Sequence, residues 1–193
     1  MLSILAGFLI AMGGIINLTL GGIPGALFFS FGLLTIVTFK YELFTGKAGL
    51  LTTGEIKPWK LCTIWLGNFI GAAACALMVS ATPSAETLAT KAAVIVALRS
   101  GQPAVINLLL GIYCGMLMYI AVTGFKYSQS YLFIIMPVAF FILCGFNHCV
   151  ADMFYTSLGA TEWKHYLHLI PTTIGNVIGC NLIPLADYYH RGV

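Results

Sequence analysis

Charged side chains are scarce in this sequence. Only 8% of the 193 residues are Asp, Glu, Lys or Arg, whereas 60% are hydrophobic, and the mean hydropathy is +0.97. Soluble domains carry about 25% charged residues, so the composition excludes a soluble enzyme and places most of the chain in a lipid bilayer. The formal net charge of +3 comes without a run of basic residues, which argues against nucleic acid as a partner.

The sequence also lacks paired cysteine motifs and the start of a cleavable leader. Its 6 cysteines stand singly within apolar stretches, so we expect small apolar residues rather than disulfide or redox sites. No charged side chain occurs over residues 1–39, so the basic segment that begins a signal peptide is missing. We therefore expect the first hydrophobic stretch to remain in the protein, and we expect neither a cofactor nor a metal site.

Apolar stretches for six membrane crossings are present, because a membrane helix needs about 20 apolar residues. The first is expected at 2–20, and the turn-forming residues Gly21-Gly22-Ile23-Pro24-Gly25 separate it from a second that begins near Gly25. A short surface helix is expected over 84–99, and the remaining crossings are expected at 59–80, 104–124, 130–158 and 168–187. Basic residues favour the loops on the side of the N-terminus, which predicts a multi-pass protein of the inner (plasma) membrane with both termini in the cytoplasm.

An internal repeat divides the chain, which we expect to form a single transmembrane domain over 1–193. The sequence Gly67-Asn68-Phe69-Ile70-Gly71 recurs as Gly175-Asn176-Val177-Ile178-Gly179, and each copy follows an interrupted crossing, at 40–46 and at 144–152. The two halves are approximately 1–80 and 104–187. Because three crossings per half is an odd number, the halves are expected to sit upside down relative to each other, with their broken helices meeting at the midplane.

Four ionisable residues lie within the two interruptions: Lys40, Glu42, His148 and Asp152. Each charged group at bilayer depth costs about 2.5–3.5 kcal/mol on insertion scales, and irregular backbone is tolerated there only inside protein or beside a wet cavity. The pattern predicts one polar site. Loop amides and the N-termini of half-helices aimed at this site would favour a small anion.

Several segments together resemble the formate/nitrite transporter family, and the resemblance spans nearly the whole chain. The matching segments are Glu42-Leu43-Phe44-Thr45-Gly46, Gly67-Asn68 with Gly71, Met136-Pro137-Val138, the residues from Gly145 to Phe154, and the residues from Ile170 to Gly179. The resemblance implies an all-α, aquaporin-like fold in which helices two and five are broken. It also implies a homopentamer with one pore per subunit that passes formate, nitrite, hydrosulfide or lactate.

The resemblance also assigns residues to the pore. His148 is similar to the family's central pore histidine, Thr45 to the loop threonine that hydrogen-bonds it, and Asn147 lies beside them. Arg99 stands where the family often has a lysine in the outer vestibule. Two hydrophobic constrictions are implied, an outer one of Phe29, Phe141 and Met118 and an inner one of Leu33, Leu43 and Phe44. In the implied mechanism a weak-acid anion gains a proton near the histidine, or from bulk water, and crosses the apolar rings as a neutral acid.

The chain departs from the family pattern at three of its charged or polar positions. The family usually has Glu before the pore histidine and Asn four residues after it, whereas this chain has Asn147 and Asp152. Lys40 is unusual because small residues stand there in the family. Since an unpaired charge would be costly at this depth, we hypothesise that Lys40 pairs with Asp152 or with Glu42.

The predicted function is a pentameric channel or proton-coupled transporter for small monovalent weak-acid anions, most strongly formate or nitrite. Its expected partners are these anions, protons, the lipid bilayer and other copies of the chain. An aquaporin-like pore for a small neutral solute is the alternative. An enzyme that uses His148, Asp152 and Cys149 is less well supported, since adjacent residues need not face one another. Arg99 could also be an interfacial anchor, and His165 with His168 lacks further ligands for a metal.

Overall fold

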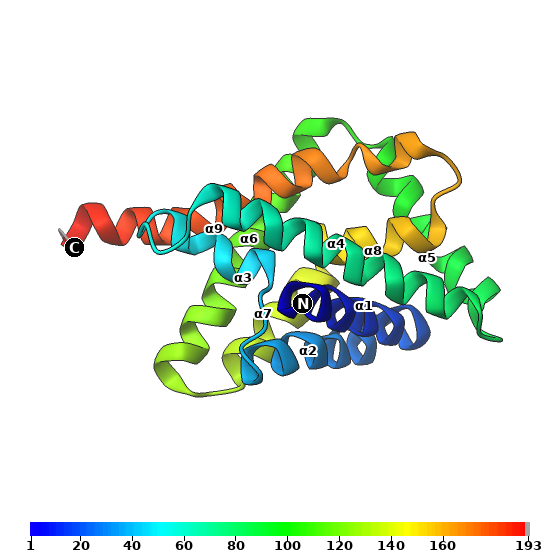
Figure 1. Cartoon of the computed structure of the whole chain (residues 1–193), viewed down its shortest axis with the longest axis horizontal. Coiled ribbons are helices and arrows are strands. Elements are labelled where there is room, and N and C mark those ends of the chain that lie inside the picture. Colours follow the sequence, from blue (N-terminus) through cyan, green and yellow to red (C-terminus); the bar gives the residue numbers. More distant parts are fainter. Residues whose placement is uncertain (192–193) are drawn as a thin grey trace.

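The computed structural model describes residues 1–191, and all regular secondary structure in this part of the chain is helical (Figure 1). Residues 192–193 of the predicted domain lie outside the described part. The α-helices are α1 (Leu2–Leu20), α2 (Gly22–Thr38), α3 (Phe44–Ala48), α4 (Pro58–Ser80), α5 (Ala85–Gly101), α6 (Ala104–Ser128), α7 (Leu132–Leu143), α8 (Cys149–Gly159) and α9 (Leu169–Arg191). Two short 3-10 helices, η1 (Gly49–Leu51) and η2 (Trp163–Tyr166), precede α4 and α9.

The long apolar helices lie where the sequence predicts crossings. By length and composition, α1, α4, α6 and the segment 163–190 are each able to cross a membrane, whereas α2 and α7 are shorter apolar helices. The second helix begins at Gly22 rather than near Gly25, so the predicted turn is confined to Gly21 and Gly22, whose φ angles are 64° and 52°. Pro24 fits within the first turn of α2, where a missing N–H costs no helical hydrogen bond.

Both predicted interruptions are present, and both begin with the same type of helix end. At the end of α2, Lys40 has a left-handed φ of 57° and the Tyr41 N–H donates to the Ile36 carbonyl. At the end of α7, Gly145 has a φ of 68° and the Phe146 N–H donates to the Phe141 carbonyl. This bond across six residues is typical of the Schellman turn, which usually places Gly at the left-handed position. Lys40 therefore occupies a backbone site that normally favours glycine.

The repeated glycines bring pairs of helices into close contact. A Cβ added at Gly71 would collide with the backbone of Ile4 in α1, and a Cβ at Gly179 would collide with the backbone of Ile112 in α6. The helices α4 and α9 are therefore packed against α1 and α6 through equivalent positions of the repeat. Small residues at helix contacts allow this close approach of backbones in membrane proteins.

Substitution of Gly179 by alanine is expected to destabilise the bundle by about 1–3 kcal/mol, because the backbone of α6 must move to admit the methyl group. The readout is the apparent melting temperature of the protein purified in detergent. Gly101→Ala is the matched control, since a Cβ at Gly101 meets no atom within 4 Å. Equal melting temperatures for the two variants would contradict the close contact between α6 and α9.

The two half-helices pack across the two halves of the chain. α3 contacts α4, α6 and α9, whereas α8 contacts α1, α4, α5 and α9. In Figure 1, α8 (yellow to orange) passes behind α4. This arrangement brings the two interruptions together in the interior.

The helix predicted over 84–99 is present as α5, but it is an integral part of the bundle. Leu88, Ala92 and Val96 are buried along one side of it, and it packs against α8. From the same helix, the Lys91 ammonium donates to the Leu18 carbonyl at 2.6 Å near the end of α1. Such a contact stabilises the unpaired carbonyls of a helix C-terminus.

Candidate functional site

Two buried asparagines hold the N-termini of the half-helices. Asn68 in α4 accepts a hydrogen bond from the Phe44 N–H at 2.8 Å and donates to the Glu42 carbonyl at 3.0 Å. Asn176 in α9 makes the same pair of bonds to the Cys149 N–H and the Asn147 carbonyl, both at 2.8 Å. Each asparagine side chain thus joins the first N–H of its half-helix to a carbonyl of the loop that precedes it. The asparagine of each repeat copy therefore fixes the loop of its own half of the chain.

Thr45 and His148 meet where these two loops converge. Thr45 lies in the first turn of α3, His148 is the residue before α8, and both are 1% exposed. The hydroxyl Oγ1 of Thr45 lies 2.9 Å from Nε2 of His148, which confirms the contact implied by the resemblance.

The tautomer of His148 follows from its second contact. Nδ1 of His148 accepts the Ala151 N–H at 3.2 Å, and a backbone N–H can only donate. In the neutral ring the proton is therefore on Nε2, which donates to Thr45 Oγ1. The hydroxyl hydrogen of Thr45 is then directed away from His148 and is available to a further acceptor.

Apolar side chains surround this contact. The rings of Phe141 and His148 are stacked with centroids 5.5 Å apart, and Phe29 meets Phe141 edge-on with centroids 5.8 Å apart. None of the six predicted constriction residues is more than 3% exposed: Phe29, Leu33, Leu43, Phe44, Met118 and Phe141. Leu33, Leu43 and Phe141 line cavities on either side of the site, whereas Phe44 and Met118 are packed away from these cavities.

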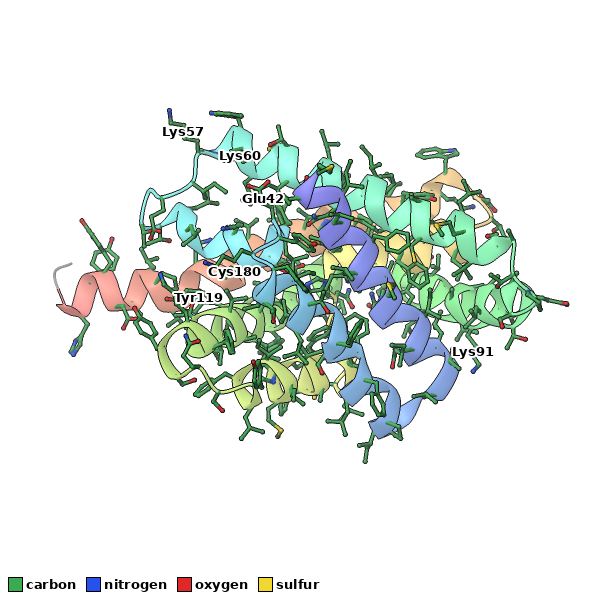
Figure 2. The ribbon with its side chains drawn as sticks, turned by 60° about the horizontal axis from the view of Figure 1, so that its bottom comes forward. Glu42, Lys57, Lys60, Lys91, Tyr119 and Cys180 are labelled. Atoms are coloured by element: carbon green, nitrogen blue, oxygen red, sulfur yellow. The ribbon has the colours of Figure 1, made fainter. Side chains whose placement is uncertain are left out.

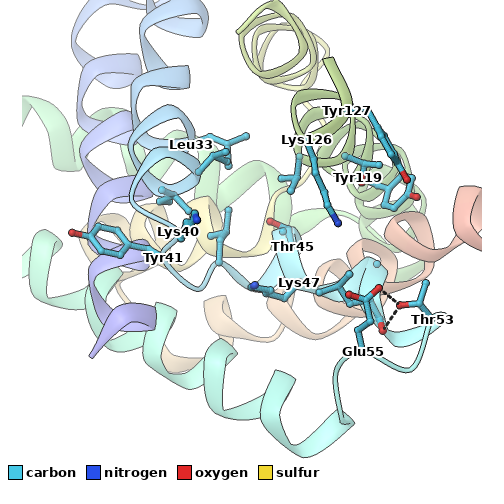
Figure 3. A pocket seen from close by; sticks show the side chains of 18 residues that line it. Leu33, Lys40, Tyr41, Thr45, Lys47, Thr53, Glu55, Tyr119, Lys126 and Tyr127 are labelled. Atoms are coloured by element: carbon cyan, nitrogen blue, oxygen red, sulfur yellow. Dashed lines mark hydrogen bonds between the residues drawn. The ribbon is translucent and has the colours of Figure 1, made fainter. Parts of the chain in front are cut away.

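A first cavity of about 500 Å³, the basic cavity, reaches Thr45 but not His148. Three ammonium groups line it, those of Lys40, Lys47 and Lys126, together with the single carboxylate of Glu55. Figure 3 shows Lys126 extending into this cavity toward Thr45, while Glu55 lies at the far wall and accepts a hydrogen bond from the Thr53 hydroxyl. The excess of positive charge favours entry of an anion.

A second cavity of about 170 Å³, the histidine cavity, reaches His148 but not Thr45. Its polar wall contains Asn17, Arg99, Asn147 and Tyr155, and Phe141 lies on its apolar wall. The basic cavity therefore ends at Thr45 and the histidine cavity ends at His148, and one hydrogen bond joins these two residues. A small solute that passes between them must cross the contact between Thr45 and His148.

The ion pairs differ from the hypothesis about Lys40. Asp152, which is fully buried, pairs with Arg99, and Glu42 lies 3.3 Å from the ammonium of Lys60. Within residues 1–191, Lys40 forms no ion pair and faces the basic cavity instead. The hypothesis is wrong because Arg99 of α5 neutralises Asp152 and Lys60 of α4 neutralises Glu42, so neither carboxylate depends on Lys40.

Arg99 is not an interfacial anchor, since its side chain is only 12% exposed. Its guanidinium also lies 5.8 Å from the ring centre of Tyr155, whose hydroxyl accepts a hydrogen bond from Asn17. Asn17 and Tyr155 are polar residues of the histidine cavity that the sequence does not predict as site residues. Asn17 gives a signal in the sequence, because it interrupts a long apolar stretch, but a lone asparagine does not identify its partner.

Asn147 is held by Asn107, which the sequence does not predict as part of the site. Its amide nitrogen donates to Oδ1 of Asn107 in α6 at 2.8 Å. Its own Oδ1 is buried and has no hydrogen-bond partner among the described residues. Asn147 thus presents an unsatisfied acceptor beside His148, in a cavity that Arg99 also lines.

Comparisons with known proteins agree with this architecture. The sequence model described as "Formate/nitrite transporter" matches residues 1–190. The formate channel FocA of Haemophilus influenzae is 28% identical over 80% of this chain and 69% of its own. A probable formate transporter of Methanothermobacter thermautotrophicus is 26% identical over 98% of this chain and 86% of its own.

Solved structures share the fold. A structure described as a pentameric formate channel with formate bound matches with a TM-score of 0.82 at 22% identity, over 97% of this chain and 94% of its own. A structure described as an FNT family ion channel matches with a TM-score of 0.85 at 24% identity, over 98% of this chain and 88% of its own. The arrangement of broken helices in this chain therefore occurs in known membrane channels.

Proposed function

Because the chain belongs to the formate/nitrite transporter family, we propose that it carries small monovalent weak-acid anions across the membrane together with a proton. Formate is the leading substrate and nitrite is the second. The chain is a multi-pass membrane protein and its relatives are channels and transporters rather than enzymes. One observation carries the proposal. The hydrogen bond between Thr45 and His148 separates a basic cavity from a second cavity that contains Arg99.

The chemistry of the site suits a weak acid. A bare anion cannot cheaply cross a dry apolar constriction, but the neutral acid can, and the imidazole of His148 can exchange the proton required. The hydroxyl hydrogen of Thr45 is a free donor suited to a carboxylate oxygen or a nitrite oxygen, and the Nε2–H of His148 becomes a second donor when its bond to Thr45 opens. The anion enters along Lys126 and Lys47, gains a proton at this contact and leaves past Phe141 and Arg99, or takes the reverse route.

The topology that fits this role has six crossings in two inverted halves. α7 has 12 residues and α8 has 11, so each is too short to cross alone, but together they reach the roughly 30 Å of a bilayer core. The equivalent bonds of Asn68 and Asn176 support two related halves, and three crossings in each half place them in opposite orientation. Figure 2 shows Lys57 and Lys60 toward one end of the molecule and Lys91 at the other, which suits the proposed cytoplasmic position of both termini in the inner membrane.

The assembly proposed is a homopentamer. The shared fold with a protein described as a pentameric formate channel supports it. The chain also exposes many large apolar side chains on its outer faces, among them Phe28, Leu77 and Leu98. Such surfaces are suited to lipid or to neighbouring subunits.

The test is uptake into vesicles that contain the purified protein. Labelled formate should enter far faster than into vesicles without protein, and unlabelled nitrite should compete with it. Swelling in an isotonic solution of a neutral polyol is the second arm. If the polyol enters while formate and nitrite do not, the chain is a neutral-solute pore and the proposal is wrong.

Loss of the Lys126 charge is expected to weaken anion entry through the basic cavity. Lys126→Met should raise the formate concentration for half-maximal flux by about two- to fivefold at low ionic strength, and by less in high salt, because the local positive potential is screened. Lys57→Met is the matched control, since Lys57 is exposed and lies outside the basic cavity and the histidine cavity. An equal effect of both substitutions would show that the basic cavity has no special part in entry.

A further inference from the structure

Asp152 and His168 face each other in the protein interior, next to the histidine cavity. The side chain of His168 is 2% exposed and that of Asp152 is fully buried, and Nε2 of His168 lies 3.9 Å from Oδ2 of Asp152. Neither of these two atoms has a hydrogen-bond partner among the described residues. They are therefore two buried polar atoms directed at one another without a donor between them.

The other ring nitrogen of His168, Nδ1, shows that no hydrogen lies between Nε2 of His168 and Oδ2 of Asp152. Nδ1 of His168 lies 2.6 Å from the carbonyl of His165, which can only accept, so Nδ1 carries a hydrogen. In the neutral ring Nε2 is then a bare lone pair that faces a carboxylate oxygen. Two acceptors at this separation attract each other only when one of them holds a proton. The pair is thus arranged to bind one proton.

A separate cavity leads to this pair. The side cavity has a volume of about 530 Å³ and is lined by polar groups of Ser100, Gln102, Asn107, Lys164, His165 and His168. Arg99 and His148 line the histidine cavity but not the side cavity, and Asp152 lines neither. Asp152 therefore lies between the two, paired with Arg99 on one side and facing His168 on the other. A proton can reach the pair without passing through the cavity of the anion.

Two further buried hydroxyls lie close to the pair in sequence, one on α8 and one on α9. Thr156 stands one helical turn after Asp152, and Thr172 stands one turn after His168. Both hydroxyl oxygens are buried and without a hydrogen-bond partner within residues 1–191. Such unsatisfied groups are expected beside water or an exchanging proton rather than in a dry apolar contact.

We propose that Asp152 and His168 form a proton-binding pair, reached from the side cavity, that controls anion entry into the histidine cavity through Arg99. Without the added proton, the Asp152 carboxylate neutralises the Arg99 guanidinium, and the wall of the histidine cavity has little net charge. A proton taken from water in the side cavity onto Nε2 of His168, or onto the carboxyl of Asp152, leaves one net positive charge. The anion is then attracted to Arg99, so anion and proton enter as a neutral pair.

Other titratable groups lie around the pair, and the carbonyl of one of them, His148, accepts the Asp152 N–H at 2.9 Å. Arg99 comes from α5, Cys114 from α6, Tyr155 from α8, and His165 and Lys164 from η2. Lys164 is paired with Glu162 at 2.7 Å, and its hydrogen bond holds the pKa of the Glu162 carboxyl below the usual value. The Glu162 carboxyl therefore stays ionised between pH 5.5 and pH 7.5, roughly the range over which histidines titrate.

The experiment measures the formate concentration for half-maximal equilibrium exchange at equal pH on both faces of protein-containing vesicles. This inference rests on the proposed function, so exchange by the unaltered protein must first exceed that of empty vesicles. We expect the half-saturating concentration to fall about tenfold between pH 7.5 and pH 5.5. His168→Gln should reduce this change to less than about twofold and keep the maximal rate, because the carboxylate loses its proton-binding partner.

Two further variants complete the test. Asp152→Asn, checked for correct assembly by its elution volume, should give a low half-saturating concentration at pH 7.5, because Arg99 is then permanently unopposed. His190→Gln, which alters an exposed histidine near the end of α9, should behave as the unaltered protein. If His168→Gln keeps the full pH response while formate still crosses, the proton-binding pair is rejected and the proposed function stands. If no variant and no unaltered protein exchanges formate, the proposed function itself fails.

Discussion

Replacing His148 with asparagine should reduce formate flux by about 10²-fold, while the protein still folds. Removal of a group that transfers a proton typically costs about 10²–10⁴-fold in rate. Asparagine is a good residue at a helix N-cap, so it can still accept the Ala151 N–H that Nδ1 of His148 accepts now. The start of α8 is therefore preserved and only the titratable ring is lost. The measurement is the initial rate of labelled formate uptake into vesicles at pH 6.

Thr45→Ser is the control for this prediction. Serine keeps the hydroxyl that lies 2.9 Å from His148 Nε2 and removes only a methyl group. Its flux should stay within about threefold of the unaltered protein, since the hydrogen bond remains possible. A His148→Asn variant that transports formate at the full rate would mean that the proton comes directly from water and that His148 is a structural cap.

Arg99→Met should destabilise the protein more than the loss of any exposed ion pair. It leaves the Asp152 carboxylate buried without its partner, which costs about 3–5 kcal/mol in comparable pairs. The double variant Arg99→Met with Asp152→Leu should recover most of the lost stability, because an apolar replacement of a whole buried pair is often neutral. The two melting temperatures in detergent, together with the yield of assembled protein, measure the difference.

The pH dependence of the single variant gives a second readout. Protonation of Asp152 removes the unpaired charge, so the deficit of Arg99→Met should shrink as the pH falls and grow as the pH rises. Lys60→Met is a suitable comparison. It breaks the pair with Glu42, in which the two side chains are 44% and 27% exposed, and such pairs contribute less than about 1 kcal/mol. Similar melting temperatures for Arg99→Met and Lys60→Met would contradict a buried pair.

The position of the site could be predicted from the sequence because it is encoded locally and twice. Charged residues within apolar stretches, the two glycine and asparagine copies and the interruptions before them all point to the same two loops. Asn68 and Asn176 then make identical bonds to those loops. The resemblance added the pairing of Thr45 with His148, which residues so far apart in the sequence could not reveal by their pattern.

The charge network could not be predicted, because ion pairs between helices depend on which faces the helices turn toward one another. Lys40 follows a Schellman turn that directs it to the basic cavity, and no local pattern shows that a lysine can occupy the left-handed position. Arg99 lies near the end of a helix that looks like a surface segment, and its burial depends on the packing of α5 against α8. His168 is separated from Asp152 by a loop and a 3-10 helix.

The coupling of formate to protons provides the most direct test of the proposed mechanism. Vesicles that contain the protein and a trapped pH indicator are given an inward formate gradient, and internal acidification is recorded together with labelled formate uptake and membrane current. We predict one proton for each formate and no net current, because the solute crosses the contact between Thr45 and His148 as the neutral acid. Formate uptake that carries current and leaves the internal pH unchanged would contradict this mechanism.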